Sequence, residues 1–465
     1  MLLDITQVNN QLHISYFNIN GETAFKIIDL KREDLFNWVV CDERDKAKDS
    51  KMKNWDERPV KKSPTRYLNK FRMHEMLKNM SISDRALIFE YNYPKTYFID
   101  IEVEVNDEFP DPLLAKTPVT AICVVTPSDQ AVVLATRDLS RTEILDIQKQ
   151  IDKHFESLGR TFSFIYKKFE SEYDMLYTFL THFVKKFPMM TGWNVINFDW
   201  SYIYNRAKRL NIDPSIASPT GELFKKNNLP QHVGCIDYMD IYKRWDRSVD
   251  IKEDFKLDTA GESTIGIKKV KYDGSLQQLY EKDYSKYIFY NAIDTCLVKL
   301  IHEKIRTLDI ALTISHISEI SIAKCDSPVA IAESLLCKGF LDIDRVMAID
   351  PERQGKSHES YEGAFVKEPI IGKHNDVACF DFASLYPSIM RELNISPESF
   401  IKTVSANERA TVTNDDVIVS VSGSIYSKKI SVLYTILTDL YAKRRTYKKK
   451  SFELQQLAYD MEHNK

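Results

Sequence analysis

Three apolar runs with strong strand character lie close together in the chain: TYFIDIEVEV at residues 96–105, VTAICVVT at 119–126 and AVVLAT at 131–136. β-branched and aromatic residues dominate them, which favours strands over helices. Two stretches with helical periodicity follow, around residues 141–157 and 171–187. Strands followed by helices in this way indicate an α/β domain. Since 465 residues suffice for about three domains, we expect a multi-domain α/β and α+β protein.

The composition, with 43% hydrophobic and 28% charged residues, is that of a folded protein. No apolar stretch approaches the ~18 residues of a membrane span, and the first residues do not resemble a signal peptide. Seven scattered cysteines without CxxC spacing argue against a disulfide framework and a zinc site. We therefore expect a cytoplasmic protein with reduced thiols.

Charge gives only a local signal. The formal net charge is −3, so binding to a polyanion must rely on basic patches. The densest patch is KRRTYKKK at residues 443–450. Taken alone, it is more typical of a solvated tail than of a binding site.

Two acidic residues interrupt the first apolar run. Asp100 and Glu102 are two positions apart, so in a strand both side chains leave the same face of the sheet. Carboxylates this close in an Ile, Val and Phe environment repel each other unless a divalent cation neutralises them. The pair indicates a metal site, and the alternative is an edge strand with a solvated acidic face.

Two later segments carry further polar residues in apolar surroundings. TGWNVINFDWSYIYNR runs from a strand end into Asn194, Phe198 and Asp199 and then into a helix. YIFYNAIDTCLV places Tyr290 and Asp294 four residues apart on one helical face, where both can contact the same water molecule. Either segment alone is compatible with a helix cap or an ordinary helix face. Three acidic segments in this order favour a shared site.

The motifs FIDIEV, GWNVINFD and YNAID are followed by YEGAFVKEP and DFASLYPSI. In order and spacing they resemble the exonuclease and polymerase motifs of family B (polymerase α-like) DNA polymerases, nearest to the replicative polymerases of large tailed phages. The resemblance implies a 3′→5′ proofreading exonuclease with an RNase H-like core. The implied segments are 1–94 (N-terminal domain), 95–306 (exonuclease), 307–352 (return to the N-terminal domain), 353–430 (partial palm) and 431–465 (first fingers helix).

The resemblance also assigns roles in the exonuclease site. It implies that two Mg²⁺ or Mn²⁺ ions are held by four carboxylates, namely Asp100, Glu102, Asp199 and Asp294. It implies that Tyr290 orients the attacking water. The implied DNA contacts are Phe109, Asn194, Phe198, Tyr361 and Gly363. For Phe109, a core position beside two prolines is the alternative.

For the polymerase site, the resemblance implies that Asp381, at the end of a strand formed by VACFDF, holds two shared metal ions. The implied nucleotide contacts are Phe382, Ser384, Leu385, Tyr386, Arg444 and Lys448. For Tyr386, which would exclude a 2′-OH, the alternative is a packed core tyrosine. The two basic residues come from LYAKRRTYK, within an apolar pattern that predicts a helix of about thirty residues from Val432.

Later parts of the family pattern do not occur in this sequence: the second fingers helix, the second palm aspartates and the thumb. Asp415 and Asp416 come too early to be those aspartates and indicate a surface turn. We expect the N-terminal subunit of a split polymerase, with primer-template DNA, single-stranded DNA and dNTP as ligands. A C-terminal partner would complete it and bring any sliding clamp. The alternatives are a fragment of a longer protein, a free-standing 3′→5′ exonuclease and a non-catalytic nucleic-acid-binding subunit.

Two local expectations concern connecting segments. The charge-dense residues 42–62 predict a surface loop or an exposed helix. The phage relatives carry an extended β-hairpin before the segment that corresponds to CIDYMDIY. This chain has only about thirty residues there, rich in turn signals, so we expect a short or absent hairpin.

Overall fold

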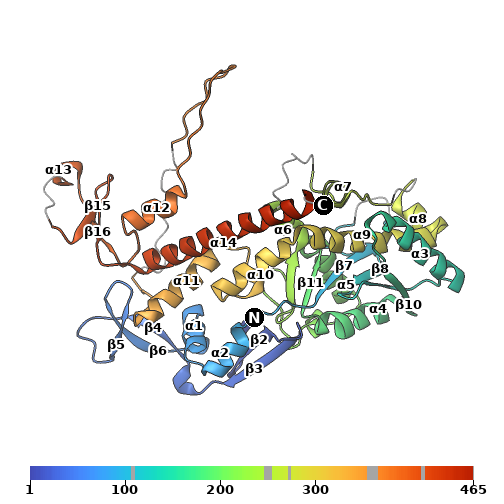
Figure 1. Cartoon of the computed structure of the whole chain (residues 1–465). Helices are drawn as coiled ribbons and strands as arrows, with labels where there is room; N and C mark the ends of the chain where they lie inside the picture. Colours follow the sequence, from blue (N-terminus) through green and yellow to red (C-terminus); the bar gives the residue numbers. More distant parts are fainter. Residues whose placement is uncertain (106–109, 246–253, 271–273, 353–364, 410–413, 464–465) are drawn as a thin grey trace. The chain divides into compact units, whose positions relative to one another are not determined.

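The computed structural model describes residues 1–105, 110–245, 254–270, 274–352, 365–409 and 414–463. The chain divides into two compact units, which Figure 1 shows in sequence colours. Unit 1 comprises Met1–Leu30 and Asn79–Ala332, and unit 2 comprises Lys31–Lys78 and Glu333–Lys465. In the described parts of the chain, no helix combines the length and apolar character needed to cross a membrane.

Unit 1 is built on a six-stranded sheet in the order β10-β9-β8-β7-β11-β12. Its strands are β7 (Thr96–Val103), β8 (Val119–Val125), β9 (Gln130–Ala135), β10 (Ser163–Lys168), β11 (Met189–Gly192) and β12 (Gly234–Asp237). β7, β8 and β9 run antiparallel, whereas β10 is parallel to β9 and β11 is parallel to both β7 and β12. The three predicted strands are thus confirmed as the central meander of the sheet.

Helices cover both faces of this sheet. They are α3 (Arg141–His154), α4 (Glu172–Thr178), α5 (Ser201–Arg209), α6 (Tyr238–Trp245), α7 (Leu257–Ile265), α8 (Leu276–Lys282), α9 (Tyr284–Ile305) and α10 (Thr307–Ser318). α3 begins at a capping box between Ser140 and Glu143. α9 packs across β7, β8 and β9 (Figure 1) and is buried along most of its length, so it forms one wall of the core.

The alternation along β7 decides what faces α9. Ile99, Ile101 and Val103 belong to the core cluster on the side of α4 and α5. Phe98 belongs to the cluster that includes the buried residues of α9. Since side chains alternate along a strand, Asp100 and Glu102 share the face of Phe98. The strand therefore presents its two acids to α9.

A small antiparallel sheet completes unit 1. It consists of β1 (Leu2–Val8), β2 (Gln11–Phe17) and β3 (Thr23–Asp29), with α2 (Ile82–Phe89) packed on β2.

Unit 2 contains a second mixed sheet in the order β13-β5-β6-β4. The strands are β4 (Phe36–Val40), β5 (Lys48–Asn54), β6 (Pro59–Pro64) and β13 (Arg345–Val346), with α1 (Lys70–Lys78) and the end of α11 (Pro328–Asp342). Phe36, Trp38 and Val60 pack against Cys337 and Leu341 in its core. The chain thus returns to this early segment near residue 345, while the five segments implied by the resemblance stay a prediction.

The C-terminal part of unit 2 contains α12 (Leu385–Glu392), α13 (Ala406–Arg409) and a sheet of β14 (Phe400–Thr403), β16 (Ser424–Ser427) and β15 (Val417–Val419). The 32-residue α14 (Val432–His463) follows. This helix and the turn at Asp415 and Asp416 agree with the sequence predictions.

Two predicted elements are wrong. Residues 42–62 form turns and the β5–β6 hairpin instead of a loop or helix. Lys61 on β6 forms an ion pair of 2.7 Å with Asp45, which precedes β5, so part of the charge in this segment is balanced locally. The VACFDF segment before α12 is not a strand. A strand requires a hydrogen-bonded neighbour, and none of the sheets in the described residues includes this segment.

The segment between α5 and β12 contains a short 3-10 turn (Pro214–Ala217) and an isolated bridge between Leu223 and Pro230.

Candidate metal and catalytic site

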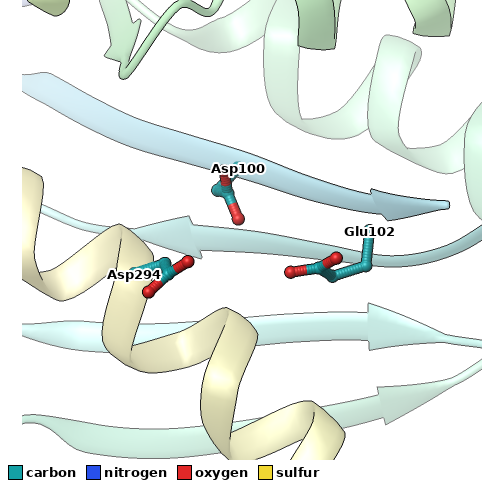
Figure 2. Close-up of side chains that lie close together, drawn as sticks. All are labelled: Asp100, Glu102 and Asp294. Carbon is teal, nitrogen blue, oxygen red and sulfur yellow. The ribbon is translucent and has the colours of Figure 1, made fainter. Parts of the chain in front are cut away.

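Three carboxylates from distant parts of the sequence converge between β7 and α9. One ligand oxygen from each of Asp100, Glu102 and Asp294 lies within 4.8 Å of the others. Figure 2 shows the two β7 side chains and the α9 side chain gathered around a common space. Glu102 and Asp294 are buried, whereas Asp100 is partly exposed. Glu102 and Asp294 therefore form the buried floor of the site, and Asp100 lies where the site is accessible to solvent.

Asp199 lies beside this cluster. It belongs to a π-helical turn (Ile196–Trp200) that follows β11 and continues into α5. Its Oδ1 accepts a hydrogen bond of 2.9 Å from the amide of Ile101, the residue between the two β7 acids. Asp199 is 2% exposed, and the charge of Asp100 raises its pKa in addition to burial. The four predicted carboxylates thus lie close enough for their charges to affect one another's pKa values.

A close backbone contact brings the Asp199 turn to β7. A Cβ added at Gly192, the last residue of β11, would lie 2.4 Å from the carbonyl oxygen of Ile99. No real side chain tolerates this distance to a backbone atom. Glycine at the end of β11 therefore permits the approach that places Asp199 next to Asp100.

Two polar side chains contact the carboxylates. The ammonium of Lys269 forms an ion pair with Asp294 and lies 4.9 Å from the ring centroid of Tyr290. Nδ2 of Asn291 donates a hydrogen bond of 2.8 Å to Oδ2 of Asp100. These contacts hold Asp100 and Asp294 in fixed orientations while leaving other oxygens available.

The carboxylates are held in an environment that disfavours their charge. Burial, together with the nearby Asp294, raises the pKa of Asp100 to about 7. Burial and the charge of Asp100 also raise the pKa of Glu102 well above its ordinary value. For Asp294, burial raises the pKa while Lys269 opposes the rise. One ammonium among four acids leaves an excess of negative charge, which a divalent cation would neutralise.

The residues present fit a divalent metal ion. Among the described residues, Oδ1 of Asp294 and Oδ1 of Asn291 are buried oxygens with no hydrogen-bond donor. A buried acceptor without a donor is costly, and a cation removes that cost. The donor set consists of oxygen atoms, which suits hard ions such as Mg²⁺ or Mn²⁺.

Two family models match the sequence. The exonuclease domain of DNA polymerase family B matches residues 73–259, and DNA polymerase family B matches residues 329–461. Together they account for well over half of the chain. The chain belongs to DNA polymerase family B. Its six-stranded sheet, with the acids on β7, is the RNase H-like core of the family's exonuclease domain, and the second match is a partial polymerase domain.

The polymerases of two phages are among the relatives. The DNA-directed DNA polymerase of Escherichia phage RB69 is 29% identical over 382 residues, which cover 75% of this chain and 41% of the relative. That of Enterobacteria phage T4 is 28% identical over 401 residues, with 79% and 43% covered. The DNA polymerase of Archaeoglobus fulgidus is 31% identical over 223 residues, with 46% and 27% covered. This chain spans about two fifths of the length of the two phage relatives.

The predicted DNA contacts are only partly described. Asn194 has a left-handed backbone with φ of 64°, and its Oδ1 accepts a hydrogen bond of 3.3 Å from Nδ2 of Asn197. Phe198 is half-buried, with its ring centroid 6.0 Å from that of Tyr202. Both flank Asp199. The other three predicted contacts, Phe109, Tyr361 and Gly363, lie outside the described residues.

The predicted polymerase residues are not gathered into a site. Asp381 is exposed in a segment without strand pairing, which corrects the prediction that it ends a strand. Phe382 and Tyr386 are 75% and 73% exposed, so the core alternative for Tyr386 is wrong. Ser384 and Leu385 lie at the start of α12, and Arg444 and Lys448 lie on the exposed surface of α14.

Three residues of the site escaped the sequence reasoning. Asn291 lies within the quoted YNAID motif, three residues before Asp294, so the helical period would have placed it on the same face. Lys269 lies in the lysine-rich GIKKVKY, where no spacing singles it out. Asp237 ends β12 and donates no ligand to the cluster, but it accepts hydrogen bonds from the loop that precedes Asp199.

Proposed function

We propose that this chain is a 3′→5′ DNA exonuclease that proofreads for a family B DNA-directed DNA polymerase. The observation that carries the proposal is the convergence of Asp100, Glu102 and Asp294 within 4.8 Å, with Asp199 bonded to the β7 backbone beside them. Four carboxylates on an RNase H-like core are suited to hydrolysis of a phosphodiester bond assisted by two metal ions. The phage relatives are consistent with a replication enzyme in the cytoplasm of a bacterial host.

Two residues beside the cluster, Tyr290 and Lys269, have further roles in this proposal. When bound, divalent ions supply an activated water and charge stabilisation at the phosphate. Burial and the charge of Asp294 raise the pKa of Tyr290, so its phenol stays neutral and can orient a water by hydrogen bonding. Burial alone would lower the pKa of Lys269, but Asp294 reverses the shift, so its ammonium stays charged near the phosphate position.

A nuclease assay tests this proposal. With Mg²⁺ or Mn²⁺ and a 5′-labelled oligonucleotide, the purified chain should shorten the DNA stepwise from the 3′ end. Asp100→Ala should abolish the shortening because the cluster loses a ligand. Asp146→Ala removes an exposed acid on α3 and should leave the activity unchanged. Equal degradation by the wild-type and Asp100→Ala chains would refute the assignment.

We further propose that Asp381, Phe382, Ser384, Leu385, Tyr386, Arg444 and Lys448 form half of a polymerase site that binds primer-template DNA and dNTP. A separate C-terminal subunit would supply the remaining fingers, palm and thumb, and a sliding clamp would bind through that subunit. The exposure of Asp381 and of the apolar side chains around it supports a surface that another polypeptide completes.

Reconstitution tests the second proposal. The chain alone should incorporate no nucleotides, because two catalytic metal ions require carboxylates from both halves of the palm. Mixing it with a polypeptide that carries the missing elements should restore synthesis, and Asp381→Ala should block it. Nucleotide incorporation by the chain alone contradicts the proposal, as does failure of the two polypeptides to associate.

A further inference from the structure

One buried acid of unit 1 lies outside the carboxylate cluster. Asp237 ends β12 and is 3% exposed. β12 is parallel to β11, and Asp237 is aligned with Gly192, the last residue of β11. A carboxylate this deeply buried destabilises the fold unless its oxygens accept hydrogen bonds.

Backbone amides satisfy both oxygens of Asp237. Oδ1 accepts hydrogen bonds of 3.1 Å from the amide of Asn194 and of 3.0 Å from the amide of Met239. Oδ2 accepts a bond of 3.0 Å from the amide of Ile196. The carboxylate therefore joins the loop that leaves β11 to the first turn of α6.

The loop that leaves β11 needs this support. Asn194 adopts a left-handed conformation, and the helical turn starts two residues later at Ile196, with Val195 as its N-cap. The first amides of a helical turn have no carbonyl acceptor, and a side chain near the start of the helix usually supplies one. Here the oxygen of Asn194 is engaged with Asn197 instead. The acceptor comes from Asp237 on the neighbouring strand, about forty residues later in the chain.

The supported turn leads directly to Asp199. Five residues after Asn194, Asp199 accepts the amide of Ile101 and so lies beside the β7 acids. We propose that Asp237 is a positioning residue of the exonuclease site: it caps the turn at residues 194–196 and thereby fixes where Asp199 meets Asp100. This inference rests on the proposed exonuclease function. Asp237 is not one of the three acids whose ligand atoms lie within 4.8 Å of one another, so its role is to position Asp199.

Steady-state kinetics test the effect on catalysis. Asp237→Asn keeps the side-chain size but replaces one acceptor oxygen with an amide donor that opposes the loop amides. We expect kcat to fall about tenfold or more, as for other residues that orient a metal ligand, while KM for an oligonucleotide stays within about twofold. Asp240→Asn is the matched control, since Asp240 is an exposed acid three residues later. An unchanged kcat in Asp237→Asn would overturn the proposal.

Hydrogen exchange tests the cap without reference to activity. Amides in the peptide spanning residues 189–200 should exchange faster in Asp237→Asn than in the wild type or in Asp240→Asn. Asp237→Ser keeps one hydroxyl acceptor, so its amides at residues 189–200 should exchange at an intermediate rate. This variant tests the cap if Asp237→Asn does not fold. If the wild type shows no exonuclease activity, the proposed function fails, while faster exchange still supports the cap. Unchanged exchange in both variants contradicts the cap itself.

Discussion

At the scale of single residues, the carboxylates that would bind metal also destabilise the folded chain. Asp100, Glu102 and Asp294 repel one another in an apolar setting, and Lys269 offsets only part of that repulsion. Such groups cost folding free energy and are retained for chemistry. The arrangement therefore makes the free protein sensitive to pH and to divalent ions.

We expect Asp100→Asn to stabilise the metal-free protein. The pKa of Asp100 is raised to about 7 in the folded state, so the fold binds this proton more tightly than the unfolded chain does. Its stabilising effect is present at acid pH and is lost as the pH rises through about 7. With EDTA near pH 8, the variant should unfold about 3 °C above the wild type in a thermal scan, and the difference should shrink steadily as the pH falls toward the ordinary aspartate pKa near 4. Adding Mn²⁺ should raise the Tm of the wild type more than that of the variant. A lower Tm for Asp100→Asn throughout this pH range contradicts this expectation, and Asp146→Asn is the control.

Lys269 should set the acid limit of the exonuclease reaction. Its ammonium lowers the pKa of Asp294 and of Asp100, so its removal should raise both. Lys269→Met should move the acid limb of the profile of kcat/KM against pH upward by about one unit. Lys268→Met removes the adjacent lysine, which pairs with Glu262 on the surface, and should leave the limb in place. If the acid limb moves equally in both variants, the loss of one positive charge is responsible and the contact between Lys269 and Asp294 is not.

At the scale of elements, α5 fixes the chain that leads into β8. Arg206 forms a two-point ion pair with Glu172 at 2.9 and 2.7 Å and donates to the carbonyl of Lys116 at 2.8 Å. Glu172 in turn accepts the amide of Val119, the first residue of β8. The contact joins α4, α5 and the central meander, and both side chains are largely buried.

Breaking this pair should destabilise the chain. Arg206→Met leaves the Glu172 carboxylate buried without its cation, so we expect a loss of about 2–4 kcal/mol in the free energy of unfolding. Removing both groups in Arg206→Met/Glu172→Met should cost less than the sum of the single changes, as measured by urea unfolding. Lys208→Met, on the exposed side of the same helix, should change little. If the double variant loses as much unfolding free energy as the two single variants together, the ion pair contributes nothing to stability.

At the scale of the whole molecule, the two units differ in how far their apolar side chains are buried. In unit 1, core clusters on both faces of the sheet include the flanking helices. In unit 2, Phe365, Ile371 and Phe380 are 91%, 96% and 93% exposed. Exposed apolar side chains gathered in one segment are typical of an interaction surface, in line with the partner that we propose for this unit.

Hydrogen exchange should therefore be fast in residues 365–384 of the chain alone. On addition of a polypeptide that carries the remaining polymerase elements, these amides should become protected by new strand pairing and burial. The β14–β16 region, which already pairs within its own sheet, should change little and is the internal control. Strong protection of residues 365–384 without any partner would contradict the proposal that this surface awaits completion.

The sequence by itself determined those features that depend on neighbouring residues. The run at residues 96–105 predicted a strand with Asp100 and Glu102 on one face, and helical spacing predicted α14 from Val432. The motif order also identified the family, because each motif is a local string. Signals of this kind act over a few residues, where backbone geometry sets the period.

Only the tertiary structure decided which distant residues meet. It placed Asp199 and Asp294 at β7, where the resemblance had implied them, and it added Lys269, Asn291 and Asp237. It also paired the charged strands that the sequence predicted to be a surface loop or an exposed helix. These contacts join residues up to about 190 positions apart. Their free energy depends on the packing of the whole core and on burial, neither of which a local pattern contains.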